Sequence, residues 1–146
     1  MVRFGIVGCG GIAKKFARDL KYVDNATITA VASLDSVKAY EYQREYDAEN
    51  VFFTYLDMAK SDAIDAVYIA LPHNLHKDTA ILFMKNHKHV LIEKPIAVNE
   101  ADLIEMIKVA KDNHVLLMEA MWTAFLPAST YVKKIIYNHD LGNLLE

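Results

Sequence analysis

The sequence is poor in cysteine and proline, and it has no long apolar run and no excess of positive charge. Its one cysteine, Cys9, cannot form a disulfide within the chain, which is typical of a reducing compartment and favours a cytoplasmic protein. No apolar run reaches the roughly 18 residues of a membrane-spanning helix, and no basic and apolar leader is present, so we expect no membrane segment or secretory signal. A formal charge of -3, with lysines and arginines scattered, does not favour nucleic acid as a partner.

What is present fits one folded domain, with 146 residues, 53% hydrophobic and 24% charged. Apolar segments with strand character alternate with segments of helical spacing. The predicted strands are 2–7, 27–32, 51–54, 66–71, 89–93 and 115–119. The predicted helices are 12–22, 36–46, 55–61, 75–86 and 100–113, the last with Asn99 as a candidate N-cap. This alternation predicts an α/β fold, a doubly wound parallel sheet of the Rossmann type with right-handed crossovers.

The first predicted strand runs directly into a glycine-rich turn. The turn consists of Gly8, Cys9, Gly10, Gly11, Ile12 and Ala13. This is G-x-G-x-x-A between a strand and a helix, the context that the dinucleotide-binding fingerprint requires. Gly8 permits the tight turn, Gly10 lets the backbone approach a pyrophosphate, and Ala13 keeps the helix close to the strand. Amides at the start of the helix would then bind the anion. The alternatives are a glycine-rich turn without a ligand and, for Cys9, a reactive thiol rather than a small side chain at a variable position.

The tip of the second predicted strand bears on the choice of cofactor. An acidic residue there binds the 2′-hydroxyl of the adenosine ribose and repels a 2′-phosphate. In this chain the tip is Ser33, a neutral hydroxyl, and Asp35 follows two residues later. Ser33 can accommodate a phosphate, so the sequence favours NADP slightly over NAD. The alternative is that Ser33 or Asp35 serves only to cap the next helix.

The segment after the fourth predicted strand holds two histidines, His73 and His76, three residues apart. No third ligand with metal-site spacing is near them in the sequence, so we expect no metal. Loops that follow parallel strands gather at one edge of the sheet. We therefore expect this loop to line the same crevice as the glycines.

The fifth predicted strand ends in Glu93, Lys94 and Pro95. A lysine at the mouth of a nucleotide crevice can donate a hydrogen bond to a substrate oxygen and stabilise negative charge that develops on it. Glu93 could orient the ammonium; alternatively, Glu93 and Lys94 form an ordinary exposed ion pair. The sixth strand leads to Glu119 and Trp122, whose indole either walls off a bound ring or anchors a hydrophobic interface.

Three segments in this order and spacing, 8–13, 93–95 and 119–123, resemble the Gfo/Idh/MocA oxidoreductases, the family of glucose-fructose oxidoreductase and inositol dehydrogenase. The segment around Trp122 is most similar to the branch with dimeric dihydrodiol dehydrogenase and NADP-dependent xylose dehydrogenase. The resemblance implies that Lys94 lies beside nicotinamide and substrate and is the catalytic candidate. It places the loop after the fourth strand in the cofactor pocket. The predicted cofactor-binding residues are Gly8, Cys9, Gly10, Gly11, Ile12, Ala13, Ser33, Leu34, Lys38, Leu71, Pro72, Asn74, His76, Glu93, Lys94, Pro95 and Trp122.

The chain departs from the family pattern at two arginines and in length. Many NADP-using relatives have arginine directly after the serine that matches Ser33, and often a second after the Trp-Thr pair; this chain has Leu34 and Ala124. Without these guanidiniums, binding of a 2′-phosphate is expected to be weaker. Members of the family also carry a C-terminal substrate domain that often forms the oligomer interface, and the resemblance implies that this domain is absent from the 146 residues.

The end of the sequence is interpreted accordingly. We expect residues 1–121 to form the dinucleotide-binding domain and residues 122–146 to be a linker helix and the start of a missing C-terminal domain. Helical spacing covers 128–138, Gly142 suits a helix stop, and Leu144 and Leu145 suit the first residues of a new strand.

These patterns predict the NAD(P)-binding domain of an oxidoreductase. In the whole enzyme a hydride would pass between nicotinamide and a hydroxyl-bearing carbon of a sugar, polyol or diol, while the isolated domain would bind cofactor with little or no turnover. The alternative is a non-catalytic nucleotide-sensing or interaction module. In that case the predicted helix, with Tyr131, Ile135 and Ile136 at helical spacing, could pair two copies into a homo-oligomer.

Overall fold

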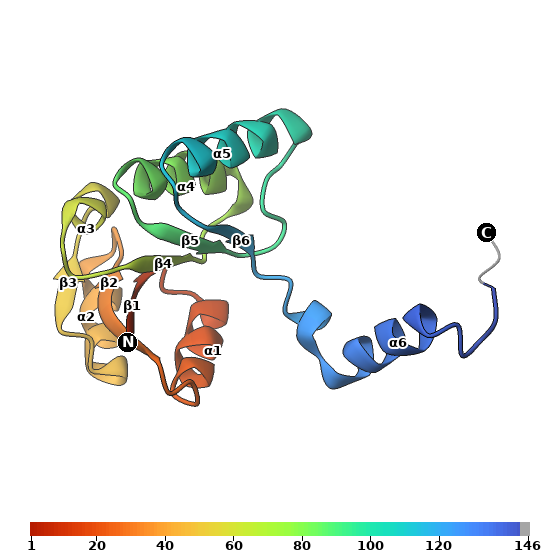
Figure 1. The fold of residues 1–146 in the computed structure, drawn as a ribbon. Coiled ribbons are helices and arrows are strands. Elements are labelled where there is room, and N and C mark those ends of the chain that lie inside the picture. Colours follow the sequence, from red (N-terminus) through yellow and green to blue (C-terminus); the bar gives the residue numbers. More distant parts are fainter. Residues whose placement is uncertain (144–146) are drawn as a thin grey trace.

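The computed structural model describes residues 1–143, and its centre is a parallel sheet of six strands in the order β3-β2-β1-β4-β5-β6 (Figure 1). The strands are β1 (Val2–Val7), β2 (Ala26–Ala32), β3 (Asn50–Phe52), β4 (Ala66–Ile69), β5 (His89–Ile92) and β6 (Leu117–Glu119). Every neighbouring pair is parallel. The strand order changes direction between β1 and β4, and ligands of such sheets bind beyond the carboxyl ends of the strands at this point.

Helices cover the sheet on both faces, which confirms the predicted doubly wound α/β architecture (Figure 1). One face carries α1 (Gly11–Leu20) and α2 (Ser36–Tyr46). The other carries α3 (Tyr55–Lys60), α4 (His76–Lys85) and α5 (Glu100–Asp112). Two short 3-10 helices, η1 (His73–Leu75) and η2 (Trp122–Phe125), follow β4 and β6. The last helix, α6 (Pro127–Tyr137), extends away from the body, and none of its residues is buried.

The hydrophobic core has two halves, one on each face of the sheet. Under α3, α4 and α5, Phe83, Met84 and Met106 are fully buried against β4 and β5, and each such side chain contributes about 1.5–3 kcal/mol by leaving water. On the opposite face the ring of Phe16 stacks on Tyr68, with 3.9 Å between the ring centroids. Because α1 and α2 cover the side of β1 and β2, this face leaves a groove beside β5 and β6.

The ends of the elements differ from the predicted ones for local reasons. The predicted fourth helix is split: η1 forms first, and α4 begins at His76. The predicted stop at Gly142 is wrong, because α6 ends at Tyr137 and His139 takes the left-handed conformation with φ 57°. Asn99 caps α5 as predicted, since its side chain accepts a hydrogen bond from the amide of Asp102. The predicted strand at Leu144 and Leu145 lies outside the described residues.

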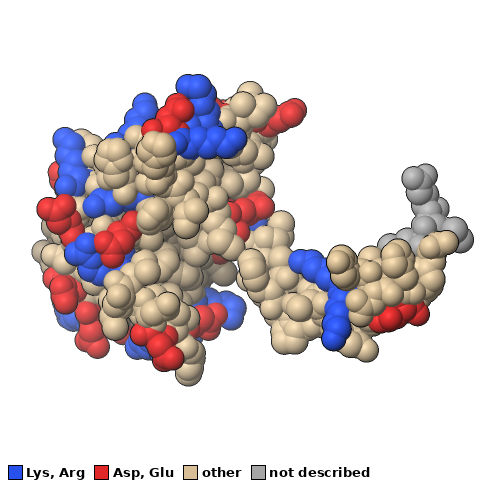
Figure 2. Space-filling view, viewed as in Figure 1, with Lys and Arg blue, Asp and Glu red and all other residues tan. Residues whose placement is uncertain are grey.

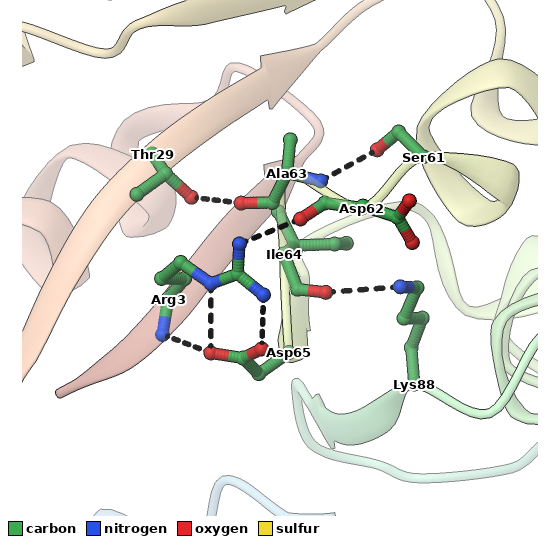
Figure 3. Close-up of polar contacts among 8 residues, drawn as sticks. All are labelled: Arg3, Thr29, Ser61, Asp62, Ala63, Ile64, Asp65 and Lys88. Atoms are coloured by element: carbon green, nitrogen blue, oxygen red, sulfur yellow. Dashed lines mark hydrogen bonds and ion pairs between the residues drawn. The ribbon is translucent and has the colours of Figure 1, made fainter.

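A polar cluster joins the amino ends of β1 and β4, at the edge opposite the crevice (Figure 3). The Arg3 guanidinium donates to both carboxylate oxygens of Asp65, over 2.5 and 3.1 Å, and to the Asp62 carbonyl over 2.6 Å. These hydrogen bonds lower the pKa of Asp65 to about 2. Beside them the Lys88 ammonium donates to the Ile64 carbonyl. The cluster fastens the two central strands to each other, away from the crevice.

Acidic and basic side chains alternate over the face of the molecule that Figure 2 shows. No continuous basic stripe is visible there among the residues that the structure describes. Nor does any helix of residues 1–143 have the length and apolarity needed to cross a membrane.

Candidate functional site

Loops from four strands meet at the carboxyl edge of the sheet. They line a cavity of about 270 Å³, whose walls are Ile12, Ala70, Leu71, His73, Glu93, Lys94 and Trp122. The start of α1, the loop after β4, the end of β5 and the segment after β6 therefore converge. Of the predicted site residues, the structure places Ile12, Leu71, Glu93, Lys94 and Trp122 together in this cavity.

Gly8 is required by the backbone of the glycine loop itself. Its φ is +91°, a conformation that side chains rarely adopt, and a Cβ built there would collide with the backbone carbonyl of Ala70. The close approach of the loop to the end of β4 thus depends on glycine. This is the tight turn that the motif predicts.

Gly10 is different, because a Cβ there would meet no atom within 4 Å. Its backbone is extended, with φ -96° and ψ 179°, which any residue can adopt. Neither the turn nor packing within the described residues explains a glycine here. The open space lies directly in front of the first turn of α1, where a ligand could approach the backbone closely.

The first turn of α1 offers unpaired amides. Within the described part of the chain, no side chain caps α1, no acidic residue lies in its first turn, and the amides of Gly11, Ile12 and Ala13 donate no hydrogen bond. Unpaired amides and the helix dipole together attract anions. The site therefore fits the diphosphate of a dinucleotide, with the Gly10 space as the cradle.

Tyr42 of α2 holds the glycine loop and was not singled out by sequence reasoning. Its hydroxyl donates to the carbonyl oxygen of Gly10 over 2.5 Å. Burial raises the pKa of Tyr42 well above its ordinary value, so the hydroxyl stays a donor at neutral pH. The only sequence signal was an aromatic residue on the inner face of a helix, and no local motif joins it to a loop 32 residues away.

The β2 tip shows what Ser33 and Asp35 do in this chain. Asp35 is the N-cap of α2, its carboxylate accepting from the amides of Val37 and Lys38 at 3.1 and 3.2 Å. These amide bonds, with the Lys38 ammonium, lower the pKa of Asp35. Ser33 is buried, and its hydroxyl accepts from the Asp35 amide. The capping alternative is confirmed for Asp35, whose carboxylate is engaged by its own helix.

The structure also places Leu34 and Lys38 after Ser33 at the β2 tip, and Cys9 in the glycine loop. The Lys38 ammonium lies 3.4 Å from Asp35 and is largely exposed, and Leu34 is exposed beside it. Cys9 is half-buried, and burial raises the pKa of its thiol, so the thiol is neutral at physiological pH. A neutral thiol does not support the reactive alternative for Cys9.

In the loop after β4, His73 and His76 have different surroundings. His73 is exposed and lines the cavity, although the predicted set did not contain it. His76 is fully buried, and its ring nitrogens lie 3.0 Å from the carbonyl oxygens of Pro95 and Leu71. Pro72 and Asn74 are exposed at η1. Among residues 1–143 no group of His, Cys, Asp or Glu side chains could hold a metal ion.

The side chains of Glu93 and Lys94 do not form an ion pair with each other. The Glu93 carboxylate is buried and accepts from the Tyr68 hydroxyl over 2.5 Å and from the backbone amide of Lys94 over 3.2 Å. In the part of the chain that the structure describes, the Lys94 ammonium has no ion-pair partner. The residue is exposed at the rim of the cavity. Lys94 thus keeps its hydrogen-bond donors available to a ligand, while Glu93 fixes the backbone beneath it.

Trp122 stands between this cavity and the groove beside β6. The groove, a second cavity of about 230 Å³, is lined mostly by apolar side chains of α1, β5, β6 and η2, together with the charged residues Lys15, Asp19, Glu93 and Glu119. The carboxylate of Glu119 accepts from the amide of Ile96 over 2.8 Å, so Glu119 organises the loop after β5. Trp122 is 56% exposed, so its indole is accessible to a bound ring and also to a partner surface, as the two predicted roles require.

Fold and site together define a dinucleotide-binding domain. A family model described as "Oxidoreductase family, NAD-binding Rossmann fold" matches residues 2–121. The chain belongs to this family, and the predicted resemblance is confirmed.

Two curated relatives and one solved structure illustrate the similarity. The scyllo-inositol 2-dehydrogenase (NADP(+)) IolU of Bacillus subtilis is 43% identical over 99% of this chain and 43% of its own length. The trans-1,2-dihydrobenzene-1,2-diol dehydrogenase of Sus scrofa is 34% identical over 98% of this chain and 43% of its own length. KijD10, a 3-ketoreductase from Actinomadura kijaniata in complex with NADP and TDP-benzene, superposes with a TM-score of 0.88 at 28% identity, covering 94% of this chain and 42% of that one. The chain thus spans less than half the length of these proteins.

Proposed function

We propose that this chain is the cofactor-binding part of an NAD(P)-dependent dehydrogenase acting on a hydroxyl-bearing carbon of a sugar, polyol or diol. The observation that carries the proposal is the uncapped start of α1 behind the open space at Gly10, beside a cavity lined by Lys94. The relatives named as inositol and dihydrodiol dehydrogenases support the substrate class.

Each wall of the cavity would have its own task. The amides of α1 would hold the diphosphate, and Tyr42 would keep the Gly10 carbonyl turned away from it. When bound, the nicotinamide supplies the hydride chemistry. The Lys94 ammonium would donate a hydrogen bond to the reacting oxygen and stabilise its negative charge, with Glu93 holding the Lys94 backbone in place.

The choice of NADP over NAD is part of this proposal. A carboxylate free at the β2 tip would repel a 2′-phosphate, but Asp35 is occupied by the amides of α2 and by Lys38. The Lys38 ammonium and the Ser33 hydroxyl are the polar groups that a 2′-phosphate would meet there. A relative named for NADP(+) and a solved structure with NADP support this choice.

The relatives are more than twice as long as this chain, and this length bears on the domain organisation that we propose. We propose that residues 1–121 are the dinucleotide-binding domain, that 122–146 lead toward a substrate domain, and that the protein works in the cytoplasm, consistent with its one unpaired cysteine. Substrate selection and any homo-oligomer would then involve the part that the relatives carry beyond the matched region.

Isothermal titration calorimetry of the chain with NADP and NAD tests the binding step. We expect binding of at least one, tighter for NADP, and loss of binding in Gly10→Val, which should still fold because a Cβ at this position meets no atom within 4 Å. No binding of either nucleotide to the folded wild type would refute the proposal. In the whole protein, Lys94→Ala with undiminished turnover would refute the role of the lysine.

A second candidate, a nucleotide sensor or interaction module, is favoured by one observation. The side chains of Tyr131, Val132 and Ile136 on α6 are exposed and apolar, a pattern suited to pairing two copies. Sedimentation velocity with and without NADP separates the two candidates. A sensor would change its assembly on binding, whereas the cofactor part of a dehydrogenase would sediment as the same species in both.

A further inference from the structure

His76 connects two of the loops that line the candidate site. It is the first residue of α4 and is 0% exposed. Its Nδ1 lies 3.0 Å from the carbonyl oxygen of Pro95, directly after Lys94. Its Nε2 lies 3.0 Å from the carbonyl oxygen of Leu71, which lines the same cavity as Lys94. The ring therefore spans from the loop after β4 to the loop after β5.

The two partners of the ring are both acceptors. A backbone carbonyl oxygen cannot donate, and a neutral imidazole carries one N–H and one lone pair. A neutral His76 could satisfy one contact only, and the lone pair of its other nitrogen would face a carbonyl oxygen at 3.0 Å. Within residues 1–143 no other backbone or side-chain group donates to either oxygen. Only the imidazolium, with two N–H donors, satisfies both carbonyls.

We propose that His76 is a positioning residue, held as a buried imidazolium that clamps the Leu71 loop to the Pro95 loop. This inference rests on the proposed cofactor site for its functional consequence. The His76 ring does not itself line the cavity. Its protonation state sets the spacing between the loop that carries Lys94 and the loop that carries Leu71. When the ring loses a proton, one of the two hydrogen bonds is lost and the walls of the cavity are free to separate.

The charge on the ring is set by opposing forces. Burial and the positive end of α4 disfavour the imidazolium, whereas two charge-assisted hydrogen bonds to carbonyl oxygens favour it. The titratable groups on the surrounding elements include His73, whose ring centroid is 5.4 Å away, and Asp78 in the first turn of α4. Glu93 and Lys94 lie on the clamped loop, and Lys77 pairs with Asp102 and Glu105 between α4 and α5. His73 is the second histidine of this loop, so its NMR signals must be separated from those of His76.

The direct test is the ¹⁵N NMR signature of the ring nitrogens in histidine-labelled protein without any cofactor. At about pH 7, exposed histidines with an ordinary pKa of about 6.5 are mostly neutral. We expect two protonated nitrogens for His76, identified as the signals lost in His76→Gln. Should that variant not fold, removing the other histidines one at a time, as in His73→Gln and His87→Asn, identifies the remaining signals. One protonated and one unprotonated nitrogen on His76 at this pH would overturn the proposal.

The functional consequence is tested by the pH dependence of NAD affinity, since the diphosphate of NAD keeps its charge from about pH 6 to 9. We expect affinity to fall about tenfold across this range, as for loss of a hydrogen bond to a charged group. His76→Gln should bind with the wild-type high-pH affinity and lose the dependence, whereas the exposed control His87→Asn, which lies outside the cavity, should retain it. The same pH dependence in His76→Gln would overturn the positioning role. If no variant binds NAD at any pH, the proposed cofactor site fails, and the NMR result alone decides the state of His76.

Discussion

The starts of α1 and α2 stand side by side at the carboxyl edge of the sheet, and they differ in how their first amides are satisfied. At α2 the Asp35 carboxylate accepts from two amides, so the helix caps itself. At α1 the preceding residue is Gly10, and no described side chain caps the helix. Both follow parallel strands of one sheet, so strand order alone does not make a ligand site. The difference lies in one position, and it leaves the first amides unpaired at α1 but not at α2, which is why the proposed anion site is at α1.

The glycine loop itself sharpens this comparison, because Gly8 and Gly10 are needed for different reasons. Gly8→Ala should destabilise the protein by about 3 kcal/mol, since alanine is strained at φ +91° and collides with the Ala70 carbonyl. Chemical denaturation measures this loss. A stable Gly8→Ala protein would mean that the loop does not depend on the close approach to β4.

An aspartate placed before α1, as at α2, should cap the first amides of α1 and so remove them from ligand binding. Gly10→Asp should raise the free energy of unfolding by a few tenths of a kcal/mol and weaken NADP binding at least about 100-fold, because the carboxylate takes the amides and repels the diphosphate. Gly10→Asn is the matched neutral control, with a similar gain in stability and a smaller loss of affinity. Denaturation and calorimetry on the same samples measure both quantities. Unchanged affinity in Gly10→Asp would contradict the account.

Removing the cap of α2 should do the reverse. Asp35→Ala should lower the free energy of unfolding, because the amides of Val37 and Lys38 lose their acceptor. Because it also releases Lys38, we expect the ratio of NADP to NAD affinity to rise about threefold, and to fall by a similar factor in Lys38→Ala. Calorimetry with both nucleotides provides the ratio. A ratio that neither substitution changes would remove the β2 tip from the proposed discrimination.

The amino edge of the sheet should affect stability and leave binding unchanged. The pKa of Asp65 is lowered to about 2 from its ordinary 3.8, so its contribution is complete above about pH 4 and is lost as the pH falls toward 2. Because Arg3 and Asp65 are 44% and 38% exposed, solvent screening limits this contribution to about 1 kcal/mol. Asp65→Asn should therefore be less stable than wild type at pH 7, with the difference vanishing near pH 2, and should bind NADP equally well. Weaker binding in Asp65→Asn would link the two edges.

Much of the fold and the centre of the site could be predicted from the sequence. The alternation of apolar segments with segments of helical spacing predicts the order of strands and helices along the chain, because parallel strands are joined by helical crossovers. The tight turn at Gly8 follows from a local motif, and the placement of Lys94 and Trp122 at one cavity follows from a family resemblance at the ends of two strands. These signals work because the residues that carry them are neighbours in sequence.

Three features of the site could not be predicted, because they join residues that are distant in sequence. Tyr42 reaches the Gly10 carbonyl from α2, and His76 contacts the Pro95 carbonyl from another crossover. The side chain of Glu93 turns inward to Tyr68 rather than outward to the neighbouring ammonium. Each of these depends on the packing of strands and helices, to which residue spacing gives no access.

The comparison between the two helix starts is tested most directly by ¹⁵N–¹H NMR of the backbone amides during a titration with NADP. The account predicts that the amide signals of Gly11, Ile12 and Ala13 shift on binding, while the capped amide of Val37, already bonded to Asp35, shifts far less. Shifts of Val37 that exceed those of the three α1 amides, or binding that leaves the α1 amides unshifted, would contradict it.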